Sequence, residues 1–347
     1  MQATTDYFSR PTTEALKGYL ALGVLLHHIY QSTHFIRTDT VLGFFLDSLG
    51  AYCVSFFFFI SGYGLLTSFN RNGGGYLCNY QRNRALPLFC INALLVVVYA
   101  TLKTLLGIEV TTCNIVLSFF YGGDIVTNGW FLLVIMLFYE MFYLAAKYFS
   151  KSVCMTVSIL TLAYIGISVL LKMPGWWHMS CLAFPCGLLF SKYKQKIDIA
   201  LSRHHLILMT IIALLFLGSF SFMYETSCNP SFVQRIPHFD FVHKCFSATR
   251  GVFFSCLVVC LLNKAGTWLK AESPISHCLS SIYLETYVLQ GIAIHMVRNA
   301  WNINDNYTAA IAIFILTLLL AVTMHPLFKQ IISAVKVPQK IKTNDKD

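Results

Sequence analysis

The sequence predicts an all-α, polytopic integral membrane protein, and three observations support this prediction. Apolar residues make up 56% of the chain, charged residues make up only 12%, and the mean hydropathy is +0.64. A soluble domain carries about 25% charged residues, so too few charges remain here to cover a soluble surface. The apolar runs exceed fifteen residues without strict alternation. Lipid permits only helices or closed barrels, and this pattern favours helices.

Ten apolar segments fit membrane-spanning helices, and glycine or proline punctuates their ends. We expect the spans at about 16–34, 51–69, 85–106, 130–149, 153–172, 176–191, 205–224, 246–263, 278–298 and 307–333. Three glycines at 73–75 follow the second span, and Pro174-Gly175 precedes the sixth. The segment 41–50 either lies along the membrane interface or extends the second span.

The distribution of lysine and arginine predicts the orientation of these spans. If the N-terminus is cytoplasmic, 18 of the 25 basic residues fall on the inner side. The remaining seven are Arg37, Lys103, Lys172, Arg235, Lys244, Arg250 and Arg298. We therefore expect both termini in the cytoplasm, with an N-terminal segment at 1–15, one ten-span domain at 16–335 and a tail at 336–347. The net charge of +10 then faces anionic lipid and does not indicate nucleic-acid binding.

Two adjacent histidines, His27 and His28, lie inside the first span. At about 1.5 Å per residue, His28 is roughly 16 Å from Lys17 along the helix. If Lys17 marks the membrane edge, His28 lies near the middle of a hydrocarbon core about 30 Å thick. Adjacent residues point about 100° apart, so only one of the pair can face a given cavity squarely. Such a histidine is either a general base for a hydroxyl or a buried side chain bonded to a neighbouring helix.

The loop at 70–84 carries three arginines, Arg71, Arg82 and Arg84, close to the membrane. They are either ordinary inward-facing charge or a clamp for the phosphates of a cytoplasmic donor, because guanidinium groups match phosphate oxygens. The preceding span ends in Ser61-Gly62-Tyr63-Gly64. These small residues indicate either close helix packing or a backbone that lines a cavity.

Two acidic residues, Glu140 and Glu285, lie well inside apolar spans, where each is costly unless it is paired or faces water. We expect both to face a cavity, Glu285 together with Tyr287 and Gln290. Trp130 opens the fourth span as an interfacial residue or a cavity contact. The twelve cysteines include no C-x-x-C pair, so we expect apolar fillers and neither a disulfide framework nor a metal site.

Several short motifs occur in order along most of the chain. Lys17-Gly18 precedes His28 by eleven positions, and the aromatic run at 56–63 ends in Ser-Gly-Tyr. They are followed by Arg84-Ala85-Leu86-Pro87, Gly129-Trp130-Phe131 with Tyr139, Phe184-Pro185-Cys186-Gly187, and Leu284-Glu285-Thr286-Tyr287-Val288-Leu289-Gln290. In order and spacing these motifs resemble those of the acyltransferase-three family, bacterial ten-span membrane enzymes that acylate sugars. The chain departs from the family in having Lys17 where Arg is usual. It also has Arg82 and Arg84 two positions apart, where the family's pair is usually three apart.

The resemblance implies transfer of an acyl group, most often acetyl, from acyl-coenzyme A to a hydroxyl of a cell-surface or exported carbohydrate at the bacterial inner membrane. It implies His28 as the general base, and we expect Lys17, Arg82 and Arg84 near the donor, with Arg71 as a further candidate. The candidate cavity and acceptor residues are Ser61, Tyr63, Trp130, Glu140, Glu285, Tyr287 and Gln290. Ser61, Tyr63 or Tyr287 would stabilise the oxyanion, and Glu140 or Glu285 would orient a histidine or bind the sugar. No bound cofactor is expected.

The alternative belongs to a different functional class. A transporter or flippase for a lipid-linked sugar, without acyl-transfer chemistry, would share the ten spans, the buried acids and the basic inner rim.

Overall fold

The computed structural model describes residues 6–120, 125–265 and 273–337, and these residues form helices with no strand. Most of the predicted tail at 336–347 and the first five residues of the N-terminal segment lie outside the described residues. The helices are α1 (Arg10–Thr33), α2 (Val41–Asn72), α3 (Tyr80–Asn83), α4 (Ala85–Leu105), α5 (Thr112–Phe120), α6 (Trp130–Tyr148), α7 (Val153–Leu170), α8 (Ala183–Cys228), α9 (Pro230–Gln234), α10 (Phe239–Ala265), α11 (Pro274–Ser281), α12 (Tyr283–His295) and α13 (Asn306–Val335). Short turns lie at η1 (Gly73–Leu77), η2 (Ser150–Ser152), η3 (Gly175–Trp177) and the π-helical η4 (Met296–Ala300).

Seven of the helices among the described residues are long and apolar enough to cross a membrane: α2, α4, α6, α7, α8, α10 and α13. This confirms a multi-pass helical membrane protein. The count of ten stays a prediction, because the helices that carry the first and ninth predicted spans, α1 and α12, are not among the seven. The predicted span at 278–298 is divided between α11, α12 and η4.

Local signals explain where several helices begin and end. Ser9 caps α1 by accepting a hydrogen bond from the backbone N–H of Thr12, so α1 begins at Arg10 and takes up part of the predicted N-terminal segment. Thr40 caps α2 in the same way. The segment 41–50 therefore extends the second span as one continuous helix.

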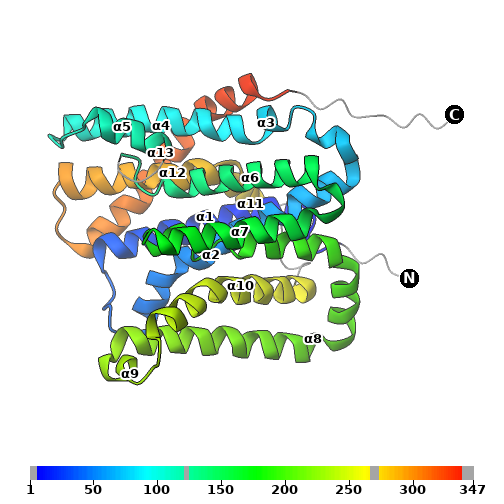
Figure 1. The fold of residues 1–347 in the computed structure, drawn as a ribbon. Coiled ribbons are helices and arrows are strands. Elements are labelled where there is room, and N and C mark those ends of the chain that lie inside the picture. The colour runs from blue at the N-terminus through cyan, green and yellow to red at the C-terminus, as the bar shows by residue number, and fades with distance from the viewer. Residues whose placement is uncertain (1–5, 121–124, 266–272, 338–347) are drawn as a thin grey trace.

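The helix α8 covers both the sixth and the seventh predicted spans. It is 46 residues long, and its backbone leaves the helical conformation at His204. In Figure 1 its second part runs along the lower edge beside α10, after the chain has turned at the right-hand end. A sequence-based division into two spans and a basic connection thus corresponds to one interrupted helix.

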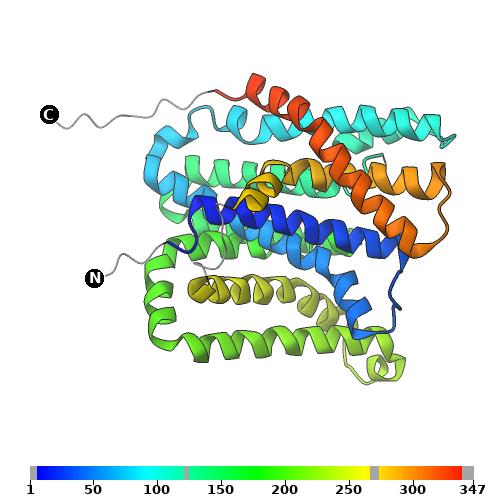
Figure 2. The same ribbon diagram turned by 180° about the vertical axis from the view of Figure 1, so that it is seen from behind.

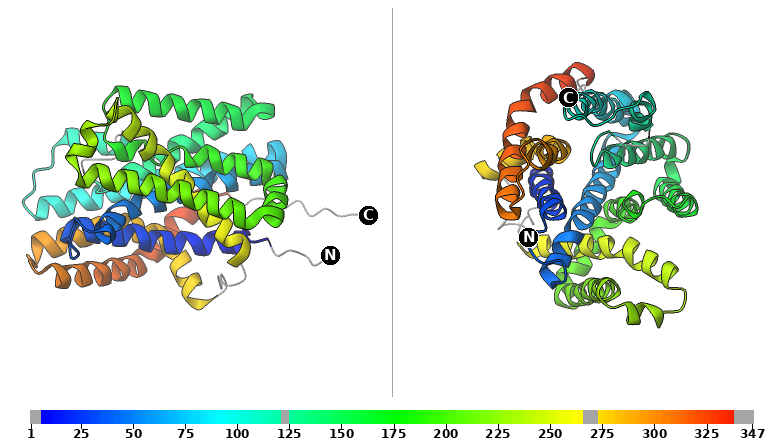
Figure 3. Two further views of the ribbon diagram at one scale, coloured as in Figure 1. Left: turned by 90° about the horizontal axis from the view of Figure 1, so that it is seen from below. Right: turned by 90° about the vertical axis from the view of Figure 1, so that its left-hand side faces the viewer.

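The helices α1 and α2 lie at the centre of the bundle. In Figure 1, α4 and α5 form one edge, α8 and α10 form the other, and α1 and α2 lie between them. Figure 2 shows α13 crossing obliquely over α12 and α1, and the right-hand view of Figure 3 looks along the bundle, with most helices end on. The start of α1 and the end of α13 lie at one end of the bundle, where Arg10 and Lys336 line the same cavity.

The packing of α2 against α8 depends on two glycines. A Cβ on Gly62 would collide with the carbonyl of Phe184, and a Cβ on Gly187 would collide with the carbonyl of Phe59. Close backbone approach of this kind is a common use of glycine in membrane helices. Two separate sequence motifs, Ser61-Gly62-Tyr63 and Phe184-Pro185-Cys186-Gly187, therefore meet at one helix crossing.

Candidate active site

The first cavity, which we call the histidine cavity, has a volume of about 630 Å³. It lies between α1, α2, α8 and α10, with the residues just before α6 closing one side. Its polar and aromatic walls include His28, Gln31, Asp47, Ser48, Trp130, Trp176, His243 and Arg250. Of the predicted acceptor residues, Trp130 is the one found in these walls.

The two adjacent histidines have different surroundings. His27 is buried, and its Nδ1 donates to the backbone carbonyl of Leu46 on α2 at 3.0 Å. Its ring lies so close to Gly50 that a Cβ there would collide with it. His28 is half-buried and lies one helical position further round α1. His27 is therefore engaged in helix packing, whereas His28 keeps a ring edge available to the cavity.

A chain of hydrogen bonds orients His28. Its Nδ1 lies 3.2 Å from Oε1 of Gln31, and Nε2 of Gln31 donates to Oδ1 of Asp47 at 3.1 Å. A carboxylate only accepts, so Gln31 must turn its amide NH₂ toward Asp47 and its carbonyl oxygen toward His28. Nδ1 of His28 must then donate. The proton is thereby held on Nδ1, and Nε2 keeps a free lone pair, as a general base requires.

Sequence reasoning missed three residues of this cavity: Gln31, Asp47 and Arg250. Gln31 follows His28 by three positions, which places both on one face of a helix, so that pair could have been found. Asp47 belongs to the segment whose structure the sequence left open. Arg250 entered the sequence analysis only as one of seven basic residues outside the cytoplasmic set.

The second cavity, which we call the basic cavity, has a volume of about 640 Å³ and lies at the end of the bundle where α1 begins. Four of the predicted site residues, Lys17, Ser61, Tyr63 and Arg84, line it, and so does Arg71. Arg10, Tyr139 and Lys336 also line it. The structure thus brings residues from α1, α2 and the 70–84 segment to one place. Ser61 and Tyr63 accordingly lie beside the predicted donor residues and away from His28.

Cations dominate the basic cavity. In the described part of the chain, Lys17, Arg71, Arg84 and Lys336 make no ion pair. Lys17 lies 5.6 Å from the centre of the Tyr283 ring, and Arg84 lies 5.9 Å from that of Tyr76. Burial, together with the charges of Arg84 and Arg10, lowers the pKa of Lys336. The cavity also contains two carboxylates, Asp6 and Glu14, which pair with Lys194 and Arg10. The cations still outnumber them, so the lining suits a polyanion.

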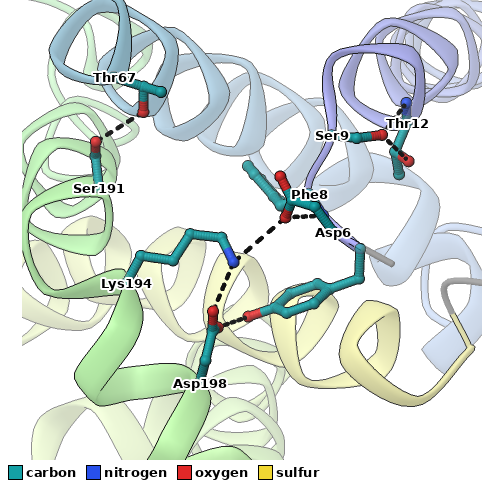
Figure 4. Close-up of polar contacts among 9 residues, drawn as sticks. Asp6, Phe8, Ser9, Thr12, Thr67, Ser191, Lys194 and Asp198 are labelled. Carbon is teal, nitrogen blue, oxygen red and sulfur yellow. Dashed lines mark hydrogen bonds and ion pairs between the residues drawn. The ribbon is translucent and has the colours of Figure 1, made fainter. Parts of the chain in front are cut away.

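An N-terminal strap, residues 6–9, forms one wall of the basic cavity (Figure 4). Lys194 on α8 binds Asp6 at 3.4 Å and Asp198 at 2.7 Å, and the hydroxyl of Tyr7 donates to Asp198 at 2.6 Å. Burial and the neighbouring Asp198 raise the pKa of Tyr7, so this phenol stays protonated and remains a donor. Phe8 packs edge-on against Tyr63, with ring centres 4.8 Å apart. The strap is therefore tied to both α8 and α2.

A series of aromatic rings separates the two cavities. Tyr283, beside Lys17, stacks on Phe57 at 6.2 Å between ring centres. Phe57 also contacts Tyr287, and Tyr287 lies 4.8 Å from Phe131, the neighbour of Trp130. On α1 the nearest lining residues of the two cavities, Lys17 and Val24, are seven positions apart, which corresponds to roughly 10 Å of helix. Tyr287 thus lies in the partition between the cavities and lines neither of them.

Arg82 and Glu140 lie elsewhere. Arg82 is not among the residues that line the basic cavity. Glu140 accepts a 2.6 Å hydrogen bond from Gln81 and lines a third, mostly apolar cavity of about 650 Å³ between α4, α6 and α7. That cavity contains neither His28 nor Lys17.

The remaining predicted residues, Glu285 and Gln290, lie within the helix core. Glu285 is buried and pairs with Nδ1 of His325 on α13 at 2.8 Å. Gln290 is fully buried and donates to the backbone carbonyl of Tyr287. Neither Glu285 nor Gln290 lines the histidine cavity or the basic cavity. Glu285 therefore links α12 to α13. The acidic residue that is hydrogen-bonded, through Gln31, to His28 is Asp47.

The described residues contain no cluster of histidine, cysteine and acidic side chains that could hold a metal ion, and the cysteines are free thiols. The arrangement places an imidazole with an open nitrogen in one cavity and a group of cations in another, with both cavities bordering α1 and α2. A family model described as an acyltransferase domain, that of the acyltransferase-three family, matches residues 13–325. Comparison with curated proteins and with solved structures found no match.

Proposed function

Because the chain belongs to the acyltransferase-three family of membrane acyltransferases, we propose that it transfers an acetyl group from acetyl-coenzyme A to a carbohydrate hydroxyl at the bacterial inner membrane. His28 is the general base in this proposal. The observation that carries it is the hydrogen-bond chain from His28 through Gln31 to Asp47, which leaves Nε2 of His28 free in a cavity of substrate size.

The donor binds in the basic cavity. Coenzyme A carries several phosphate charges, and Lys17, Arg71 and Arg84 line this cavity without ion-pair partners among the described residues. Guanidinium and ammonium groups bind phosphate oxygens through charge-assisted hydrogen bonds. The placement supports Arg84, Lys17 and Arg71 as donor contacts more strongly than it supports Arg82.

The thioester must then reach His28. The pantetheine arm is long and thin, so it can cross the roughly 10 Å that separates the cavities along α1. On this path it passes the aromatic partition formed by Phe57, Phe131 and Tyr287. Tyr287 therefore acts on the passage of the donor arm in this proposal, and the acceptor binds beyond it.

The chemistry is a direct acyl transfer. The acceptor hydroxyl oxygen attacks the thioester carbonyl carbon while Nε2 of His28 takes the hydroxyl proton. Collapse of the tetrahedral adduct breaks the carbon–sulfur bond, and the departing thiolate takes that proton from the imidazolium. Asp47, acting through Gln31, stabilises the imidazolium and holds its orientation. The products are the acetyl ester and free coenzyme A, so every atom and proton is accounted for.

The test uses the full chain purified in nanodiscs with radiolabelled acetyl-coenzyme A. We expect saturable donor binding, slow release of free thiol without acceptor, and faster release with a carbohydrate acceptor. A transporter or flippase without chemistry would release no thiol under any of these conditions. That result would sink the acyl-transfer proposal even if a sugar bound.

A further inference from the structure

Arg250, on α10, is a buried cation in the wall of the histidine cavity. Its side chain is 7% exposed. Nη1 donates to the hydroxyl of Ser48 at 3.2 Å, and Nη2 lies 3.6 Å from the sulfur of Met179. The guanidinium carbon lies 5.5 Å from the centre of the Tyr52 ring, and Nε has no hydrogen-bond partner. Soft or neutral groups thus surround the charge, and one donor is unused.

No carboxylate among the described residues forms an ion pair with Arg250. Asp47 lines the same cavity, but it accepts the amide hydrogen bond of Gln31. The other ionisable groups of the cavity are the histidines His27, His28 and His243. An unpaired buried charge is costly, and the charge of Asp47 favours Arg250 only from beyond ion-pair distance. The cavity is therefore built for an anion that the protein itself does not supply.

The position of Arg250 relates this anion to the base. Ser48, its hydroxyl partner, is the sequence neighbour of Asp47, which holds Gln31 and through it His28. Trp130 and Trp176 line the same cavity and offer flat apolar faces. At about 630 Å³, the cavity falls in the size range of small-molecule sites. Arg250, His28 and both tryptophans therefore line one cavity that is large enough for a sugar unit.

We propose that the acceptor is an anionic carbohydrate whose carboxylate or phosphate oxygen binds the guanidinium of Arg250, which thereby presents a hydroxyl to His28. The role of acceptor rests on the proposed acyl transfer, whereas the anion site itself does not. Arg250 is a binding residue that selects charged over neutral sugars. A guanidinium suits this task because its planar fork matches either oxyanion and stays charged.

The test measures binding to the full chain in nanodiscs of zwitterionic lipid, by calorimetric titration at fixed ionic strength. The probes are glucuronic acid for the carboxylate source, glucose 1-phosphate for the phosphate source, and glucose as the neutral reference. We expect one of the two anions to bind about tenfold to a hundredfold more tightly than glucose, as charge-assisted hydrogen bonds provide. The tighter of the two identifies the source. Equal binding of all three probes would overturn the proposal.

Three variants make the result specific to Arg250. Arg250→Met should bring the anion down to the affinity of glucose, with glucose affinity changed less than about twofold, and its melting temperature should be equal or higher because an unpaired buried charge is removed. Arg250→Lys keeps the charge without the fork, so it should retain the fold and lose anion affinity severalfold. Arg235→Met removes an exposed arginine that does not line the cavity, and it should leave the preference intact. Retained preference in Arg250→Met, or its loss in Arg235→Met, would contradict the proposal.

Donor binding is titrated separately with acetyl-coenzyme A. Normal donor binding and thiol release without any anion preference would overturn the anion site alone. An intact anion preference without donor binding or thiol release would overturn the acyl transfer and leave an anionic-sugar site. The two failures are therefore distinguishable.

Discussion

The histidine cavity and the basic cavity are nearly equal in volume, about 630 and 640 Å³, and both border α1 and α2, but they are built differently. The basic cavity gathers cations from separate elements and closes one side with the N-terminal strap. The histidine cavity has one hydrogen-bonded chain that ends on His28, and one cation, Arg250, without an ion-pair partner among the described residues. Removal of any one cation should therefore reduce ligand binding in the basic cavity only in part. Removal of His28 alone, in contrast, should remove most of the turnover that depends on the histidine cavity.

The largest effect on turnover is expected when the proposed general base of the histidine cavity, His28, is removed. His28→Ala should reduce turnover by about a hundredfold to ten-thousandfold, the usual contribution of a general base, and acetyl-coenzyme A should bind as in the parent. The measurement is acceptor-dependent thiol release beside donor titration. Turnover within a few-fold of the parent would show that another group is the base.

His27→Ala is the matched control. This variant should keep most of the turnover and have a lower melting temperature. The carbonyl of Leu46 loses its side-chain donor, and the space that the His27 ring fills against Gly50 is left empty. The Leu46 carbonyl lies within α2 and keeps its helical hydrogen bond, so the loss is that of one side-chain hydrogen bond, about 0.5 to 1.5 kcal/mol, together with the lost packing. An inactive but stable His27→Ala protein would reverse the assignment of the two histidines.

The next effect tests whether Asp47 determines the tautomer of His28. An asparagine amide can donate to Gln31, so in Asp47→Asn the Gln31 amide can turn its NH₂ toward Nδ1 of His28, and the proton moves to Nε2. We expect turnover to fall about tenfold to a hundredfold, as for other residues that orient a functional histidine. Asp39→Asn makes the same change at an exposed acid that pairs with Arg37, and it should leave turnover unchanged. Equal turnover in the two variants would show that the chain does not orient the base.

A comparable loss, in affinity rather than in rate, is expected in the basic cavity. Arg84→Ala should weaken donor binding about tenfold, since one charge-assisted contact is lost, while Arg82→Ala should leave it unchanged because Arg82 does not line the cavity. Calorimetric titration with coenzyme A at two salt concentrations measures both. If Arg82→Ala shows the larger loss, the donor phosphates lie outside the basic cavity.

The smallest effect is expected for the strap. Tyr7→Phe keeps the ring but removes the hydrogen bond to Asp198, so donor affinity should fall only a few-fold. Tyr19→Phe removes a hydrogen bond to Ser276 on another face of α1 and serves as the control. A loss in Tyr7→Phe as large as that in Arg84→Ala would make the strap a principal donor contact, and the proposed difference between the cavities would disappear.

The fold class could be predicted from the sequence because it depends on local properties. Long apolar runs with few charges leave only helices in lipid, and Ser9 and Thr40 define helix starts through contacts within three residues. The division of 183–228 into two spans agrees with the break at His204, whereas the predicted span at 278–298 is divided between α11, α12 and η4. A hydropathy pattern reports how long an apolar segment is and is insensitive to a backbone break within it, such as the one at Ile282 between α11 and α12.

The sequence by itself determined that His28 follows Lys17 by eleven positions, and it predicted Lys17, Arg82 and Arg84 as donor contacts. Only the tertiary structure decided which polar side chains pair with each other. It paired Gln31 with Asp47 across 16 positions and Glu285 with His325 across 40, and it left Arg250 without a carboxylate partner among the described residues. The physical reason is that helices such as α2 are apolar on nearly every side, so their sequence does not specify which face turns inward. A buried polar group takes its partner from whichever helix packs beside it, and that neighbour is determined by the packing of the whole bundle.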